Sequence, residues 1–306
     1  MKPDIILPNN PGFSRMACMT DDIPFHCEGS RQSITLIRPY KGSQDEPDRR
    51  CPLVVFLQGS GWTSPNRFFQ LPQLCRYAQQ GIAVASITHR DSTQGHPFPA
   101  YLKDAKAAVR FLRSQAGELG LDPDRIAFFG TSSGGNTALL AGLTGDDLRY
   151  QTDDYAGYSD AVRAVVDCFG PTDLLSYEGS VLSETLSLDE KADIAALQAE
   201  YSEQDNGIMQ IMFALIGRQD VLHVIKSMSP LYEVRDHEPY PPFLLVHGDA
   251  DPVVPINQSV RMHARLQAAG ADSTLVEITN AEHEGTFWSE SVHELIFSFL
   301  KKHLDA

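Results

Sequence analysis

Short apolar runs alternate with longer amphipathic stretches along most of this chain. Most of the runs are continuous and rich in Val, Ile, Leu and Phe, as expected of strands buried on both faces of a sheet. Runs of this kind lie at residues 53–57, 82–88, 126–129, 162–169, 243–246 and 273–278. Helical patterns lie at residues 67–80, 101–115, from 136 onward, 256–269 and 288–303. The alternation predicts an α/β fold in which helices flank a mostly parallel central sheet and the crossovers are right-handed.

Two segments near the amino terminus do not follow this alternation. Residues 1–30 contain four prolines and no periodic pattern, so we expect an irregular N-terminal arm. Such an arm could pack over the domain or cover part of a site. Residues 33–38 (SITLIR) alternate in polarity, which predicts an edge strand.

The alternation is interrupted again by an insertion at residues 174–229. Two helical patterns, at residues 188–201 and 208–216, fall inside it. The insertion follows the carboxyl end of a strand, where ligands bind in open α/β sheets, so we expect a helical cap over the site. The side chains expected to reach the substrate pocket from this cap are Met209, Met212 and Phe213. Ordinary core packing of these side chains is the alternative.

The composition is that of a globular protein. The 306 residues are 42% hydrophobic and 21% charged, enough to bury a large core, and we expect a single domain over residues 1–306. The net charge of −15 argues against nucleic acid or an anionic membrane surface as a partner, because both would repel the chain. No apolar run approaches the length of a membrane span. The oligomeric state stays open, a homodimer included.

Two features bear on localisation. The apolar stretch at residues 5–7 ends at Pro8 and is too short for a secretory segment. The five cysteines, which share no C-x-x-C spacing, are Cys18, Cys27, Cys51, Cys75 and Cys168. They suggest neither a disulfide framework nor a zinc site, and free buried thiols in a reducing compartment fit best. The sequence therefore predicts a cytoplasmic protein.

A serine stands at the apex of the strongest local pattern, residues 125–141 (RIAFFGTSSGGNTALLA). A β-type run meets G-x-S-x-G and then turns helical, which predicts a strand, a sharp turn and a helix. The turn would lift Ser132 above the sheet edge, and side chains at Gly130 and Gly134 would collide. The amino end of the following helix favours an oxyanion beside the serine. Ser132 is therefore a candidate nucleophile, with a glycine-rich structural turn as the alternative.

A second glycine-rich loop, residues 58–62 (QGSGW), follows directly after the apolar run at 53–57. Small residues after a central strand allow backbone N–H groups to approach a ligand closely. Taken alone, the loop is equally compatible with an ordinary turn. Together with the serine turn, it is a candidate contributor to an oxyanion hole.

An acid and a histidine follow the serine, each after a predicted strand. Asp251 lies beyond residues 243–246, and His283 lies beyond residues 273–278. Serine, then acid, then histidine is the chain order of the α/β-hydrolase triad. Asp249 is the rival acid.

Longer motifs extend the resemblance over most of residues 50–300. They are FLQGSGW, PFPAYLKDAKAAVRFLR, LDPDRIAFFGTSSGG, VVDCFGPTD, PPFLLVHGDADPVVP and AEHEG. Together they resemble the α/β-hydrolase superfamily and, within it, the acetyl-esterase and feruloyl-esterase-like (BD-FAE) branch. That branch shares features with hormone-sensitive-lipase-like esterases, kynurenine formamidases and prolyl-oligopeptidase catalytic domains. The motifs are specific for the fold and much less specific for the substrate.

The resemblance implies an α/β-hydrolase fold with a twisted sheet, in which Ser132 is the nucleophile, Asp251 the acid and His283 the base. The oxyanion hole that it implies is made of backbone amides of Ser133 and of the loop residues Gly59, Ser60 and Gly61, with Ser60 the first candidate within the loop. Trp62, the last residue of the loop at 58–62, is a candidate for the substrate pocket. No metal or organic cofactor is implied.

Two positions depart from the family pattern. The family usually has His-Gly-Gly before the tryptophan, whereas this chain has Gln58-Gly59-Ser60. Asn136 stands where a histidine is frequent. Neither departure touches the three triad positions.

The expected activity is hydrolysis of carboxylic esters with short acyl or hydroxycinnamoyl groups, including acetyl or feruloyl groups on plant oligosaccharides. Ser132 would form an acyl-enzyme with His283 as the proton carrier. An amidase, peptidase or kynurenine-formamidase-like hydrolase on the same triad is one alternative. A catalytically silent α/β-hydrolase fold that only binds a ligand or protein is the other.

Overall fold

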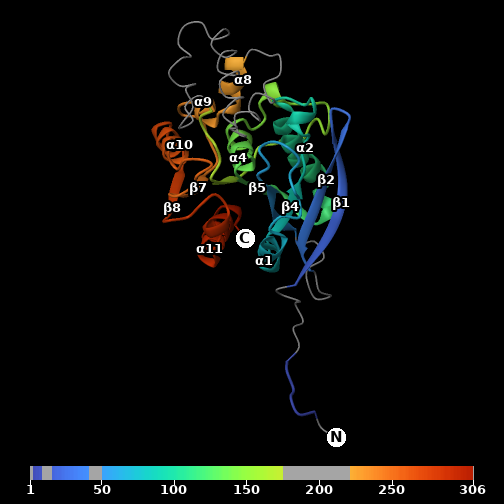
Figure 1. Cartoon of the computed structure of the whole chain (residues 1–306). Helices are drawn as coiled ribbons and strands as arrows, with labels where there is room; N and C mark the ends of the chain where they lie inside the picture. Colours follow the sequence, from blue (N-terminus) through green and yellow to red (C-terminus); the bar gives the residue numbers. More distant parts are fainter. Residues whose placement is uncertain (1–2, 9–15, 41–49, 175–220, 306) are drawn as a thin grey trace.

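A single eight-stranded sheet organises the protein (Figure 1). The computed structural model describes residues 3–8, 16–40, 50–174 and 221–305. The strand order is β1-β2-β4-β3-β5-β6-β7-β8. The strands are β1 Ala17–Cys27, β2 Ser30–Pro39, β3 Cys51–Leu57, β4 Ala83–Ile87, β5 Leu121–Thr131, β6 Ala164–Cys168, β7 Phe243–Gly248 and β8 Ser273–Ile278. Strands β3 to β8 are parallel to one another, and β2 is antiparallel to both of its neighbours, β1 and β4, which confirms the predicted mostly parallel sheet.

Helices cover both faces of this sheet (Figure 1). The helices of the described residues are α1 Leu71–Gln79, α2 Ala100–Ser114, α3 Ala116–Leu119, α4 Ser133–Leu143, α8 Val221–Met228, α9 Pro230–Glu233, α10 Asn257–Ala268 and α11 Glu290–Leu304. One core lies between the sheet and α2, α4, α8 and α10, and a second lies between the sheet and α1 and α11.

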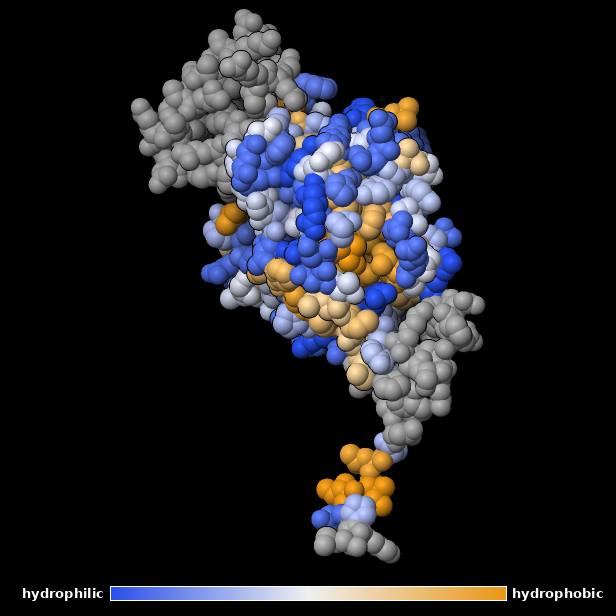
Figure 2. Space-filling view, turned by 90° about the vertical axis from the view of Figure 1, so that its right-hand side faces the viewer, coloured by the Kyte–Doolittle hydropathy of each residue, from blue (hydrophilic) through white to orange (hydrophobic). Residues whose placement is uncertain are grey.

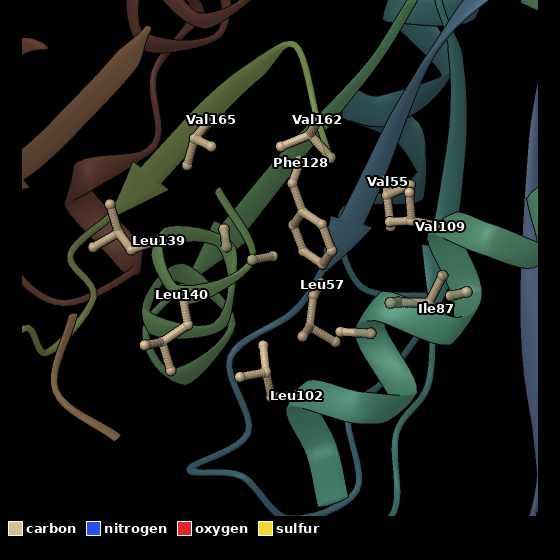
Figure 3. Close-up of a cluster of buried hydrophobic side chains, with 14 of the residues drawn as sticks. Val55, Leu57, Ile87, Leu102, Val109, Phe128, Leu139, Leu140, Val162 and Val165 are labelled. Carbon is tan, nitrogen blue, oxygen red and sulfur yellow. The ribbon is translucent and has the colours of Figure 1, made fainter. Parts of the chain in front are cut away.

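Strand β3 shows how the sequence builds both cores. Its side chains alternate between the faces, so Val55 and Leu57 join the core beneath α2 and α4 (Figure 3), whereas Val54 and Phe56 join the core beneath α1 and α11. All four are fully buried. Burial of each such side chain contributes roughly 1.5–3 kcal/mol, which explains why the run is continuously apolar.

The N-terminal arm is more ordered than we expected from its sequence. Residues 17–27 form β1, which pairs with β2, so the prediction of an irregular segment over residues 1–30 is wrong there. The pattern is hidden by a register shift between Thr20 and Ile23, with Asp22 in a left-handed conformation (φ 55°). Because β2 is paired on both sides, it is not the edge strand that we predicted, and β1 takes that place.

Several boundaries also differ from the sequence pattern. Helix α4 begins at Ser133, three residues earlier than expected, because the two glycines of its first turn weaken the helical signal. Helix α1 begins at Leu71 and not at Arg67, since Gln70 adopts a left-handed conformation (φ 56°). The last strand, β8, has the predicted bounds.

The expected cap falls mostly outside the described residues, as do its helical patterns at 188–201 and 208–216 and the pocket candidates Met209, Met212 and Phe213. All five cysteines are free, but only Cys27 and Cys168 are buried, so the expectation of buried thiols holds for two of them.

One face of the body is mostly hydrophilic, whereas the N-terminal segment carries exposed apolar residues. Figure 2 shows hydrophilic residues over most of one face of the body, with the apolar residues of the N-terminal segment standing clear of it. In that segment Ile5, Ile6 and Leu7 are each more than three-quarters exposed. In the part of the chain that the structure describes, no helix is both long and apolar enough to cross a bilayer.

Candidate active site

Ser132 occupies a strained turn between β5 and α4. Its backbone angles, φ 52° and ψ −123°, lie outside the regions that serine normally adopts. Its N–H donates to the carbonyl of Cys168 at the end of β6 (2.9 Å). A conformation of this kind costs roughly 1–3 kcal/mol and persists only where surrounding contacts enforce it. The turn predicted from the G-x-S-x-G pattern is therefore present.

The glycines of this turn are required by close backbone packing. A Cβ atom at Gly130 would lie 1.9 Å from the carbonyl oxygen of Gly134, and one at Gly134 would lie 2.1 Å from the carbonyl oxygen of Leu57. Neither contact is possible without displacement of the backbone. The steric reason that we inferred from the sequence for these two glycines is confirmed.

Asp251 and His283 form a direct hydrogen bond. Asp251 follows β7, His283 follows β8, and Asp251 Oδ2 lies 2.7 Å from His283 Nδ1. The other carboxylate oxygen accepts the N–H groups of Val253 (2.8 Å) and Val254 (2.9 Å). Because an ionised carboxylate only accepts, the proton of the neutral imidazole stands on Nδ1 and leaves Nε2 with a free lone pair. The rival acid Asp249 instead accepts the N–H of Asn280.

A second histidine, which we did not predict from the sequence, lies against the same carboxylate. His247 is fully buried in β7, and its Nε2 is 2.7 Å from the Val254 carbonyl and 3.4 Å from Asp251 Oδ2. The carbonyl requires a proton on Nε2, so Nδ1 accepts from the hydroxyl of Ser259 (2.7 Å). Its position in the HGDAD motif next to Asp251 was the available signal.

The end of β6 links Ser132 to the histidine. The Ser132 N–H donates to the carbonyl of Cys168. The next residue is Phe169, and the centroid of its ring lies 4.5 Å from the centroid of the His283 ring. The side chain of Asp251 is fully buried, while that of His283 is 13% exposed. Four parallel strands, β5 to β8, thus bring the three predicted triad residues to one edge of the sheet.

Electrostatics keep a negative charge beside the imidazole. Burial raises the pKa of Asp251, but hydrogen bonds from His247 and His283 outweigh this effect and hold the pKa well below its ordinary value. Burial also raises the pKa of Glu284, although the indole N–H of Trp288 donates to its Oε2 (2.5 Å) and opposes that rise. Ionised Asp251 can therefore stabilise an imidazolium at His283 throughout the neutral range.

The loop at residues 58–62 lies directly against the serine turn. The Gly59 N–H donates to Thr131 Oγ1 and the Ser60 N–H donates to Ser133 Oγ, both at 2.9 Å. The amide of Ser133 is the first of α4 and has no acceptor within the helix. Trp62 is only 3% exposed and packs on Tyr101, so most of this pocket candidate lies within the core.

The two departures from the family pattern each have a structural use. The Gln58 side chain accepts the N–H of Asn66 (2.8 Å) and so ties the start of the loop to the segment that follows it. The buried Asn136 amide donates to the carbonyls of Pro171 and Met228, both at 2.8 Å. It therefore fastens α4 to the loop after β6 and to the end of α8.

The described residues around this site offer no candidate metal centre. In the part of the chain with defined coordinates, no three His, Cys, Asp or Glu side chains are grouped so that they could hold a metal ion. The chemistry that this arrangement offers is a serine hydroxyl, an imidazole and a carboxylate at one sheet edge, with backbone amides beside the serine.

The chain matches a known family over most of its length. The BD-FAE family model matches residues 42–266. Esterase LipQ of Mycobacterium tuberculosis is 30% identical over 302 residues, which cover 96% of this chain and 65% of LipQ. Esterase LipC of the same organism is 30% identical over 242 residues, which cover 78% of this chain and 54% of LipC. The chain thus spans about half to two thirds of the length of these relatives.

Solved structures show the same architecture. A truncated carbohydrate esterase from gut microbiota is similar with a TM-score of 0.73 and 25% identity, over 98% of this chain and 99% of that chain. A bifunctional GH43-CE protein of Bacteroides eggerthii has a TM-score of 0.71 and 28% identity, over 94% of this chain and 35% of that one. The predicted α/β-hydrolase fold is confirmed, and the chain belongs to the BD-FAE family.

Proposed function

We propose that this chain is a serine carboxylester hydrolase in which Ser132 is the nucleophile, His283 the base and Asp251 the acid. The observation that carries the proposal is the 2.7 Å hydrogen bond between His283 Nδ1 and Asp251 Oδ2 at the sheet edge that also bears strained Ser132. In a catalytically silent fold, neither a strained serine nor an imidazole oriented by a buried carboxylate at the same sheet edge would be needed.

In the first half of the reaction, His283 Nε2 takes the proton of the Ser132 hydroxyl while Oγ attacks the ester carbonyl. The carbonyl oxygen becomes an oxyanion that accepts hydrogen bonds from backbone amides beside the serine, each contributing about 3–4 kcal/mol. Asp251 keeps the imidazole in the tautomer with its proton on Nδ1. Collapse of the tetrahedral intermediate breaks the ester C–O bond, and the imidazolium gives its proton to the leaving alcohol.

In the second half, a water molecule takes the place of the alcohol. His283 removes a proton from the water as its oxygen attacks the acyl carbonyl of the Ser132 ester. The second tetrahedral intermediate expels Oγ, which recovers its proton from the imidazolium. The products are a carboxylic acid, an alcohol and the free enzyme, with no need for an oxidant or cofactor.

We further propose short-acyl or hydroxycinnamoyl esters as substrates, among them acetyl or feruloyl groups on plant oligosaccharides. The support is the carbohydrate esterase that resembles this chain over 98% of its length. The free buried thiols of Cys27 and Cys168 support a reducing, cytoplasmic setting.

The test is a substrate panel measured on wild type and Ser132→Ala. It includes p-nitrophenyl esters of increasing acyl length, methyl ferulate and acetylated xylan, with N-formylkynurenine as the amide arm. We expect wild type to hydrolyse at least the short-acyl esters and the variant to lose about 10³-fold or more in kcat. Turnover restricted to the formamide would replace the esterase proposal with the amidase alternative. A variant as active as wild type would contradict the role of Ser132.

A further inference from the structure

Two hydroxyl groups hold the loop at residues 58–62 against the serine turn. They belong to the residues on either side of Ser132: Thr131 Oγ1 accepts the Gly59 N–H and Ser133 Oγ accepts the Ser60 N–H, each at 2.9 Å. Thr131 is fully buried and Ser133 is 2% exposed. Consecutive amides of one loop are therefore bonded to side chains that flank the proposed nucleophile.

The loop has little freedom to satisfy these amides in another way. A Cβ atom at Gly59 would lie 2.5 Å from Ser132 Cβ, so the two backbones are already in close contact. Farther along, Ser60 and Thr63 close a tight turn in which the Thr63 N–H (3.2 Å) and hydroxyl (2.6 Å) donate to the Ser60 carbonyl. The Ser60 hydroxyl donates back to the Thr63 carbonyl (3.1 Å). The turn is rigid, and its placement relative to Ser132 depends on the two flanking hydroxyls.

We infer that the hydroxyls of Thr131 and Ser133 are positioning groups that set the geometry of the oxyanion hole. The inference rests on the proposed function, since it takes Ser132 as the nucleophile. The amides of Gly59 and Ser60 already donate to Thr131 Oγ1 and Ser133 Oγ, so Ser60 is not the donor that we expected from the sequence. Of the four predicted donors, the amides of Gly61 and Ser133 are left to receive the oxyanion. The hydroxyls do not touch the substrate. They fix the distance between those two amides, one on the loop and one at the start of α4.

Loss of either hydroxyl should lower kcat more than it changes KM. A displacement of about 1 Å in a catalytic group can cost roughly 10²-fold in rate, while ground-state binding is less sensitive to the position of an oxyanion donor. We expect Ser133→Ala and Thr131→Val to reduce kcat by about 10- to 100-fold with KM within about twofold of wild type. Thr131→Ser keeps the hydroxyl and should restore most of the rate.

A matched control removes a buried hydroxyl that does not hold the loop. Thr137 is fully buried in α4, and its hydroxyl donates to the Ser133 carbonyl (2.8 Å). A bond of this kind back to the helix backbone adds little stability, so Thr137→Val should keep the wild-type rate. Thermal unfolding of every variant separates a loss of fold from a loss of positioning.

The decisive readout is affinity for a trifluoromethyl ketone, which forms a tetrahedral adduct with the serine hydroxyl. Its inhibition constant should rise in parallel with the loss of kcat in Ser133→Ala and Thr131→Val, and should stay unchanged in Thr131→Ser and Thr137→Val. A Ser133→Ala variant with kcat at or above wild type would overturn the inference, because the hydroxyl would then merely obstruct the Ser60 amide. Persistence of ester hydrolysis in Ser132→Ala would instead overturn the proposed function, so the two failures are distinguishable.

Discussion

Asp251 and His283 are 32 residues apart in the chain, yet Asp251 Oδ2 lies 2.7 Å from His283 Nδ1. The parallel pairing of β7 with β8 brings the loops after these strands together. The carboxylate is also fixed by two backbone amides, so the imidazole is oriented by a rigid partner.

The first prediction concerns this carboxylate. Asp251→Asn would replace an acceptor with an amide that favours the wrong imidazole tautomer, so kcat should fall by about 10³- to 10⁴-fold. Asp249→Asn is the matched control. Asp249 accepts a hydrogen bond from the backbone N–H of Asn280, and the side-chain oxygen of an asparagine can accept the same bond. Steady-state hydrolysis of p-nitrophenyl acetate by the two variants provides the measurement. Equal losses in both variants would contradict the assignment of Asp251.

A second prediction tests the contact between the loop and the serine turn. Gly59→Ala places a methyl group 2.5 Å from Ser132 Cβ, so the loop must move away from the nucleophile. We expect kcat to fall by roughly 10²-fold or more. Gly117→Ala is a suitable control, because its Cβ would meet only the Arg50 guanidinium, at 3.9 Å. Steady-state kinetics of both variants measure the loss of kcat, and circular dichroism checks that both are folded. An unimpaired Gly59→Ala enzyme would argue against close packing between the loop and Ser132.

The third prediction concerns the pH profile. Glu284 is next to His283, and its carboxylate is held by Trp288 Nε1. Loss of that negative charge makes a positive charge on the neighbouring ring less favourable, so Glu284→Gln should move the acidic midpoint of kcat/KM to lower pH. Glu282→Gln, on an exposed side chain, should leave the midpoint unchanged. Identical profiles for Glu284→Gln and wild type would show that this charge does not act on the base.

The fourth prediction links a buried carboxyl to stability. Burial raises the pKa of Asp167 to about 7, while Gly170 N–H donates to its Oδ1 and the neighbouring His247 opposes the rise. In the unfolded chain this carboxyl titrates near 3.9, so between these values the folded state binds a proton that the unfolded state releases. Its contribution to stability is therefore present at low pH and declines as the pH rises through this window.

Denaturant unfolding of wild type and Asp167→Asn at pH 5 and pH 8 measures this effect. The asparagine stays neutral, so wild type should lose stability relative to the variant by about 1.4 kcal/mol for each pH unit within the window. Parallel pH dependence of the two proteins would show that Asp167 does not titrate in this range.

The serine, acid and histidine could be predicted because each follows a strand whose apolar run is visible in the sequence. Once the strands are parallel, their carboxyl ends share an edge, so three residues far apart in the chain can be assigned to that edge. The need for glycine at positions 130 and 134 was predictable from the local pattern. A side chain there would collide with the backbone of the serine turn itself or of the strand beside it.

Features that depend on contacts between distant segments could not be predicted in this way. Strand β1 was missed because a register shift and two aspartates break its alternation. The roles of Thr131 and Ser133 depend on how closely another loop approaches. Lys106 lies in the predicted helix but is fully buried, because Asp160 pairs with it at 2.7 Å across 54 positions of chain. The hydrophobic periodicity of a helix does not reveal that a buried charge has a partner elsewhere in the chain.

The most direct test of the account is the site of covalent modification by a fluorophosphonate. Ser132 Oγ should displace fluoride and form one phosphonyl ester per chain, located on the peptide containing residue 132 by mass spectrometry, as ester hydrolysis is lost in proportion. His283→Ala should slow this labelling strongly. Labelling of a different residue, or full ester hydrolysis by a chain already modified at Ser132, would contradict the central claim.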